Sequence, residues 1–158
     1  MTLHVRTALP TDAVALCRVI NRIIQIGGTT AYDTPFSPEG LIAEFLRPKF
    51  IIACHLAETE NGAVGFQSIV RSDPDWSGPD RLGPEWALIS TYVAEGTQGT
   101  GIGTRLFAQT LHAARADGVA SINATIRLGN AGGRAYYSRM DFVPWREDVQ
   151  TVWQRFDF

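Results

Sequence analysis

A glycine-rich turn between a strand and a helix is the feature of this sequence that most constrains its fold. Residues 86–93 before it are apolar and β-prone, and residues 104–117 after it have the periodicity of an amphipathic helix. The turn contains Gly96, Gly99, Gly101 and Gly103. Such a turn exposes backbone N–H groups, and the helix dipole favours an anion beside them. The pattern therefore predicts a phosphate-binding loop.

Two common phosphate-binding motifs do not fit the spacing of these glycines. The ATP/GTP loop requires Gly-Lys-Ser/Thr, but Ile102 and Gly103 follow Gly101 here. The sequence thus lacks the lysine for the β- and γ-phosphates and the hydroxyl for magnesium. The dinucleotide motif requires a third glycine where this sequence has Thr104 or Leu106, and its ribose-binding acidic residue is also missing.

The segment Gln98–Gly103 resembles the Arg/Gln-x-x-Gly-x-Gly/Ala motif of the GCN5-related N-acetyltransferases, whose loop holds the pyrophosphate of acetyl-coenzyme A. Val93 ends the preceding strand at the family's distance from the loop. A second segment, Asn130–Phe142, resembles the family's run of Asn, small residue, Tyr and Gly-Phe, although Asp141 replaces the glycine. Aspartate tolerates left-handed backbone better than most residues, so the turn can be kept. The resemblance covers nearly the whole chain.

Length and composition predict one small soluble domain spanning residues 1–158. The net charge of −2 argues against nucleic acid as a partner. No apolar run reaches the ~20 residues needed to span a membrane, and no secretory signal is visible, so we expect a cytoplasmic protein. Cys17 and Cys54 lie in apolar stretches and are expected to be buried thiols. No Cys/His cluster has zinc-ligand spacing, so we expect no metal.

The hydrophobic pattern gives the element order of an α/β domain. It predicts strands at 3–8, 50–57, 62–70, 86–93, 119–126, 143–146 and 151–156, and helices at 10–26, from 37 onward, at 104–117 and at 130–139. The resemblance implies a mixed, mostly antiparallel sheet flanked by helices, with its fourth and fifth strands splayed apart. That gap would make room for pantetheine.

The resemblance also assigns a cofactor site. The implied contacts to acetyl-CoA are Thr91, Tyr92, Val93, Gln98, Gly99, Thr100, Gly101, Ile102, Gly103, Thr104, Asn130 and Arg134. Where the strands separate, N–H groups near Tyr92 and Val93 lose their ladder partners. They can then pair with the pantetheine amides and the acetyl oxygen, in the manner of an oxyanion hole. Gln98 replaces the loop's common arginine, and Arg134 is either a partner for the 3′-phosphate or a solvated surface charge.

Tyr137 stands where the family's proton-donating tyrosine stands, seven residues after Asn130. That spacing is close to two helical turns, so both side chains share a face. A phenol with a pKa near ~10 is a weak acid toward a thiolate near ~8.5. Tyr137 is therefore expected to act through a hydrogen bond that strengthens as the sulfur gains charge, or through a concerted transfer. Its neighbour Tyr136 is the better candidate for a core tyrosine.

The general base is the least defined part of the prediction. Parts of the chain resemble the phosphinothricin-acetyltransferase-like branch of the family, namely Val19–Ile24, Thr29–Tyr32 and Ser90–Val93. That branch carries a glutamate where this chain has Leu88. Glu85 lies three residues earlier, at the start of the same strand. Side chains alternate along a strand, so its side chain is expected on the opposite face from that of residue 88. The base is therefore Glu85 through water, another group such as Asp33, or none at all for an amine of low pKa.

Two function classes follow. One is an N-acetyltransferase acting on a small primary amine, with an amino-acid-like acceptor expected. The other is a non-catalytic acyl-CoA-binding or sensing protein, which a blocked pocket or a buried Tyr137 would favour. For the acceptor, we expect one wall from Tyr32 and Asp33 and another near Arg146, which could hold a carboxylate through two parallel hydrogen bonds. In family relatives these regions often come from paired subunits, so the resemblance implies a homodimer.

Overall fold

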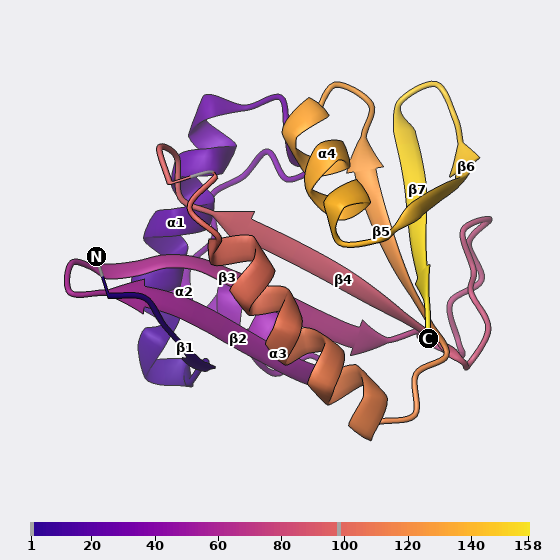
Figure 1. Cartoon of the computed structure of the whole chain (residues 1–158), viewed down its shortest axis with the longest axis horizontal. Coiled ribbons are helices and arrows are strands. Elements are labelled where there is room, and N and C mark those ends of the chain that lie inside the picture. The colour runs from indigo at the N-terminus through magenta and orange to yellow at the C-terminus, as the bar shows by residue number, and fades with distance from the viewer. Residues whose placement is uncertain (1, 98) are drawn as a thin grey trace.

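The strands form one mixed sheet in the order β1-β2-β3-β4-β5-β7-β6 (Figure 1). The structure is a computed structural model that describes residues 2–97 and 99–158. The strands are β1 (His4–Thr7), β2 (Ile51–Thr59), β3 (Gly62–Arg71), β4 (Trp86–Val93), β5 (Ser121–Arg127), β6 (Val143–Glu147) and β7 (Thr151–Asp157). The helices are α1 (Ala13–Ile26), α2 (Pro38–Leu41), α3 (Ile102–Ala116) and α4 (Ala131–Arg139), with a 3₁₀ turn at Pro10–Asp12 and a π-helical turn at Ile42–Leu46.

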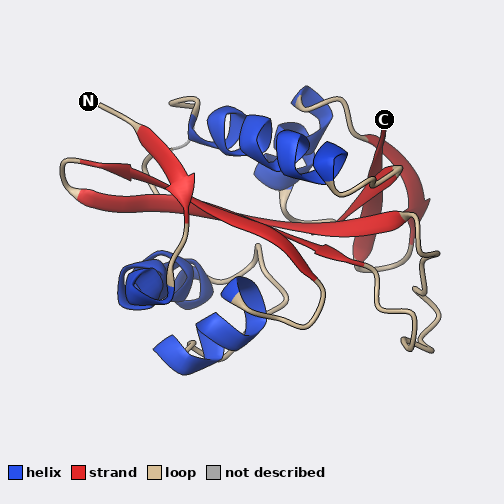
Figure 2. Cartoon of the chain, turned by 90° about the horizontal axis from the view of Figure 1, so that it is seen from below, coloured by secondary structure: helices blue, strands red, loops and turns tan. Residues whose placement is uncertain are grey.

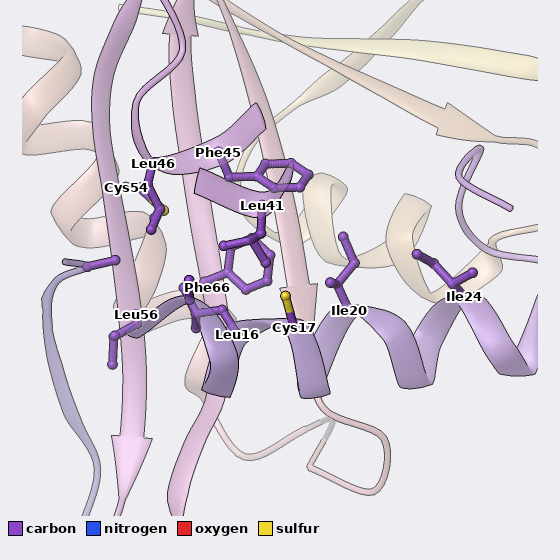
Figure 3. Close-up of a cluster of buried hydrophobic side chains, with 12 residues drawn as sticks. Leu16, Cys17, Ile20, Ile24, Leu41, Phe45, Leu46, Cys54, Leu56 and Phe66 are labelled. Atoms are coloured by element: carbon purple, nitrogen blue, oxygen red, sulfur yellow. The ribbon is translucent and has the colours of Figure 1, made fainter. Parts of the chain in front are cut away.

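Helices cover both faces of the sheet (Figure 2). On one face, α1 presents Leu16, Ile20 and Ile24 at helical spacing, and these side chains are buried. Figure 3 shows them on the side of α1 that faces the cluster around Phe45 and Phe66. Each such aliphatic side chain contributes roughly 1.5–3 kcal/mol when fully buried. Cys17 and Cys54 lie in the same cluster as free, buried thiols, as predicted.

The other face is covered by α3 and α4. Phe107 of α3 and Tyr137 of α4 pack with Phe142 and with the β5 side chains Ile122 and Ala124. The ring of Phe142 lies 5.5 Å from that of Phe107 and 5.0 Å from that of Tyr137. This second core fixes α4 over β5, beside the end of β4.

The sheet divides in two between β4 and β5. The two strands run parallel and pair only at three positions, Trp86 with Ser121, Ala87 with Ile122 and Leu88 with Asn123. Beyond Leu88, β4 stays paired with β3 as far as Val93, while β5 stays paired with β7 as far as Arg127. Figure 1 shows the two strands diverging from the end nearest the C-terminus. The splayed mixed sheet predicted from the sequence is thus confirmed.

Two helices begin at a residue whose side chain caps the first turn. Ser37 Oγ accepts from the N–H of Gly40 at 3.0 Å, and Asn130 Oδ1 accepts from the N–H of Gly133 at 2.9 Å. The helix after the glycine turn begins at Ile102, two residues before its predicted start. Within the described residues, no helix has the length and apolar character needed to cross a membrane.

Asp141 is the non-glycine residue of the described chain that has positive φ, at 69°. It ends α4 where the family pattern has glycine, and its left-handed conformation confirms the turn predicted from the sequence. A left-handed conformation costs a residue with a Cβ about 1–2 kcal/mol, and somewhat less for aspartate. The turn is therefore kept under mild strain.

We expect Asp141→Gly to raise the free energy of unfolding by roughly 0.5–1 kcal/mol, because relief of strain exceeds the added entropy of the unfolded glycine. Asp141→Ala should lower it by about 1 kcal/mol, because alanine cannot bond locally in this conformation. Urea unfolding of the three proteins measures both effects. A glycine variant less stable than the alanine variant would contradict this account of the turn.

Candidate active site

The glycine loop adopts the conformation that a phosphate-binding turn requires. Gly99 and Gly101 have φ of 79° and 83°, and Gly101 is the N-cap of α3. A Cβ built on Gly101 would meet no atom within 4 Å, so conformation rather than crowding requires glycine there. Thr100 is exposed beside it. Gln98 lies outside the described residues. The 15-residue helix α3 thus presents its N-terminus at a glycine turn, which suits a pyrophosphate.

The first turn of α3 packs directly against α4. A Cβ on Gly103 would lie 2.5 Å from Cε1 of Tyr136, so the close contact requires glycine. Tyr136 Oη donates to the Gly103 carbonyl oxygen at 2.8 Å. Ile102 is buried in the core, while Thr104 is exposed in the first turn. The structure therefore brings the two sequence motifs into contact, and only the backbone of Ile102 is available to a cofactor.

Tyr137 lies beside the part of β4 that has separated from β5. Its Oη is 2.8 Å from Thr91 Oγ1, on the part of β4 that has left β5. The side chain is 7% exposed, and burial raises its pKa well above that of a free phenol. A phenol with a raised pKa holds its proton firmly. The geometry thus favours a hydrogen bond to the leaving sulfur over full proton transfer.

Successive residues of β4 serve opposite faces of the sheet. Thr91 faces α4, whereas the ring of Tyr92 packs 5.6 Å from that of Phe45, on the face covered by α1 and α2. Burial raises the pKa of Tyr92 to about 12. Val93 returns to the α3 face and packs near Ile102. The side chains of Tyr92 and Val93 are therefore structural, which leaves their backbone groups for the cofactor contacts expected there.

Asn130 connects α4 to the loop after α1. Besides capping α4, its Nδ2 donates to the Thr29 carbonyl oxygen at 3.2 Å. The loop from Gly27 to Phe36, one predicted wall of the acceptor site, thus reaches the end of α4. The role of Asn130 seen in the structure is to join these segments.

Arg134 does not face the glycine loop. It lines a cavity of about 450 Å³ between α4 and the β6–β7 hairpin, together with Ser138, Glu147 and Gln154. Tyr136, which contacts Gly103, lies two residues away and so points about 200° around the helix. The structure therefore places the predicted 3′-phosphate partner on the opposite side of α4 from the loop.

Glu85 is not brought to the opening either. Its side chain is exposed before β4 begins, and its carbonyl oxygen accepts from the N–H of Ala120 at 3.0 Å. The three paired residues Trp86–Leu88 lie between it and the point where the strands separate. The structure thus separates Glu85 from Tyr137.

The predicted acceptor residues lie in two separate regions. Tyr32 Oη donates to Glu44 Oε1 at 2.8 Å, and Asp33 is exposed beside Thr34. Arg146 donates to the Pro79 carbonyl oxygen at 3.1 Å, and its guanidinium lies 4.6 Å from the ring centre of Trp153. Among the described residues, no hydrogen bond or ion pair recorded for Tyr32 or Asp33 reaches Arg146.

A cavity beside Leu88 contains a carboxylate that the sequence did not suggest. The cavity has a volume of about 450 Å³ and lies on the α2 side of β4. Its lining includes Glu44, Lys49, Trp76 and Asp80. Glu44 is far from Leu88 in the chain and sits on the π-helical turn, so no local pattern could have linked the two residues. Among the described residues, no group of three or more His, Cys, Asp or Glu side chains could hold a metal ion.

The geometry just described agrees with the sequence comparison. A model of the acetyltransferase (GNAT) family matches residues 21–142, most of the chain. The chain belongs to the acetyltransferase (GNAT) family. It is an acetyl-CoA-dependent N-acetyltransferase, and acetyl-CoA is its cosubstrate. The glycine turn at the N-terminus of α3 and the separation of β4 from β5 after Leu88 are consistent with that cosubstrate.

Individual relatives support this assignment. The chain is 28% identical to phosphinothricin N-acetyltransferase of Streptomyces viridochromogenes over 128 residues, 80% of this chain and 67% of the relative. The solved phosphinothricin acetyltransferase of Sinorhizobium meliloti, in complex with acetyl-CoA, superposes with a TM-score of 0.81 at 17% identity, covering 100% of this chain and 89% of that one. Ribosomal-protein-alanine N-acetyltransferase from Brucella melitensis superposes with a TM-score of 0.80 at 23% identity, covering 98% and 99%. Enzymes named for such different acceptors share this fold, so the fold does not identify the acceptor.

We expect Gly101→Val to abolish measurable acetyl-CoA binding in calorimetry, because the side chain would stand in the cradle and the backbone could not keep its φ of 83°. Gly118→Val is the matched control. Gly118 has a φ of 73°, also has open space around it, and lies beyond the other end of α3. The control should lose stability similarly and keep its affinity. Equal affinities in the two variants would contradict the loop assignment.

Proposed function

We propose that the acetyl group moves by direct attack of a small primary amine on the thioester. The nitrogen–carbon bond forms, the carbon–sulfur bond breaks and its electron pair goes to the sulfur, while the ammonium proton leaves to a base. The observation that carries this proposal is the position of Tyr137 Oη, 2.8 Å from Thr91 on the separated part of β4. A phenol there can donate to the leaving sulfur.

The burial of Tyr137 bears on its role. A buried tyrosine was expected of a non-catalytic acyl-CoA-binding protein, and the side chain is 7% exposed. Family membership makes the protein an acetyltransferase, so the burial concerns how the hydroxyl acts rather than the class of protein. Only the hydroxyl has to meet the sulfur, and a dry site strengthens the hydrogen bond that it gives.

Glu44 is better placed than Glu85 to receive the proton of the amine. Glu44 lines the cavity that contains Leu88, the position at which the strands part. Glu85 lies on the other side of the paired segment. Tyr32 donates to Glu44 and holds its carboxylate in place. Asp33 and an amine that needs no base are the remaining alternatives.

The proposed acceptor is a small, polar primary amine with a carboxylate, such as an amino acid or a phosphinothricin-like analogue. The curated relative named for phosphinothricin supports this choice. Arg146 would hold the carboxylate through two parallel hydrogen bonds. The acceptor regions stay apart within one chain, and Val143, Trp145 and Val149 of the β6–β7 region expose apolar surface, which supports a homodimer. Two free thiols support a cytoplasmic location.

Tyr137→Phe should bind acetyl-CoA normally and lose turnover by about 10²–10⁴-fold, the range for removal of a general acid. Tyr136→Phe is the neighbouring control, because Tyr136 Oη already donates to the Gly103 carbonyl oxygen. Its smaller loss would come from the hydrogen bonds that the hydroxyl makes with Gly103 and Gln67. Burial raises the pKa of Tyr137, so wild-type turnover should not fall from phenol ionisation below pH ~10. Undiminished turnover in Tyr137→Phe, where chemistry limits the rate, would remove Tyr137 from the mechanism.

Arg146→Ala should raise KM for an amino-acid acceptor by roughly tenfold or more, the effect of losing a charge-assisted hydrogen bond, with little change in KM for acetyl-CoA. Arg155→Ala is the matched control. Arg155 also lies over a tryptophan, 4.5 Å from the ring centre of Trp86. Steady-state kinetics with amino acids, polyamines and peptides make the measurement. Activity on proteins together with no activity on any free amino acid or small amine would exclude this acceptor.

A further inference from the structure

A buried glutamine connects the parts of the candidate active site. Gln67 of β3 is 0% exposed and lies directly across from Thr91 of β4. Its Nε2 donates to Thr91 Oγ1 at 2.8 Å and to Tyr136 Oη at 3.0 Å. Its Oε1 accepts from the hydroxyl of Thr110, which is also 0% exposed. Both N–H groups and the carbonyl oxygen have partners, as a polar side chain in a core requires.

The hydroxyl of Tyr136 fixes the orientation of this amide. Tyr136 donates its one proton to the carbonyl oxygen of Gly103, and a carbonyl can only accept. The atom of Gln67 that faces Tyr136 must therefore be the amide nitrogen. The second N–H of that nitrogen is then directed at Thr91, which accepts.

The same reasoning identifies the acceptor of the Thr91 hydroxyl proton. Thr91 Oγ1 lies 2.8 Å from Gln67 Nε2 and 2.8 Å from Tyr137 Oη, and Tyr136 is a further hydrogen-bond neighbour of this hydroxyl. Because Thr91 accepts from Gln67, its own proton goes to Tyr137. The proton of Tyr137 is then left for an acceptor in the opening between β4 and β5. The reverse direction would leave the Thr91 proton only the Tyr136 hydroxyl, which already accepts from Gln67 and donates to Gly103, at a cost in free energy.

We propose that Gln67 is a positioning residue that sets the direction of the hydrogen-bond chain Gln67–Thr91–Tyr137, so that Tyr137 presents its proton to the leaving sulfur of acetyl-CoA. This inference rests on the proposed role of Tyr137. Gln67 does not touch the substrate and acts only through Thr91. Tyr136 and Thr110 hold the amide from its other sides, which gives the chain of hydrogen bonds a single direction.

A double-mutant cycle tests this role, because it separates action through Tyr137 from a general loss of structure. Gln67→Met and Thr91→Val are each made in the wild type and in the Tyr137→Phe variant. In the wild type each should lower kcat about tenfold, as expected for one hydrogen bond, while KM for acetyl-CoA changes little. In the Tyr137→Phe background neither substitution should lower kcat further.

Ser68→Ala is the control for loss of a buried hydrogen bond. Ser68 is the next residue of β3, is 3% exposed, and donates to the Phe45 carbonyl oxygen on the opposite face at 3.0 Å. This variant should lose stability and keep its kcat. Thr91→Val carries the test if Gln67→Met does not fold, because Thr91 is only half-buried.

The two possible failures are distinguishable. If Gln67→Met and Thr91→Val lower kcat by the same factor in both backgrounds, the positioning role is overturned while the proposed function stands. If Tyr137→Phe itself keeps full turnover, the proposed role of Tyr137 is overturned, and the inference with it.

Discussion

The separation of β4 from β5 after three residue pairs is the constraint on which the rest of the site depends. β4 continues on β3 and β5 continues on β7, so each strand is stabilised on one side and free of the other. The two cores lie on opposite faces of the sheet, and the one under α3 and α4 packs Ile89 of β4 together with Ile122 of β5. Backbone groups that a regular sheet would use in its ladder become available to a ligand.

A connected set of polar side chains lies beside the part of β4 that has separated from β5. The amide of Gln67 and the hydroxyls of Thr91, Thr110 and Tyr136 form a connected set beside Tyr137. In a low-dielectric interior such a set is stable only when its groups are paired, and then it admits few arrangements. This makes it suited to holding one phenol in one orientation. The packing of the apolar cores, by contrast, depends only on the volume and shape of their side chains.

Local chemistry explains which parts of the site were predictable. Gly101, Ser37 and Asn130 act through their own backbone or through an N–H three residues away, so the sequence near them is sufficient. Asp141 was predictable for the same reason, because the left-handed turn is a property of one residue. Arg134 was proposed from its place one turn into the helix after Asn130, and Glu85 from its place at the start of the strand that contains Leu88. In the structure Arg134 lines the cavity beside the β6–β7 hairpin, and Glu85 precedes the paired segment Trp86–Leu88. The side on which a surface charge points depends on what packs around it.

The sequence by itself determined the element order and the glycine turn, because these follow from short-range periodicity and backbone preference, and its two motifs carried the resemblance to the family. Only the tertiary structure decided that Gln67 would meet Thr91 and Tyr136, and that Glu44 would share a cavity with Leu88. These partners lie far apart in the chain and are joined by strand register and helix packing. A residue's own type says which hydrogen bonds it can make, while the fold selects the residue with which it makes them.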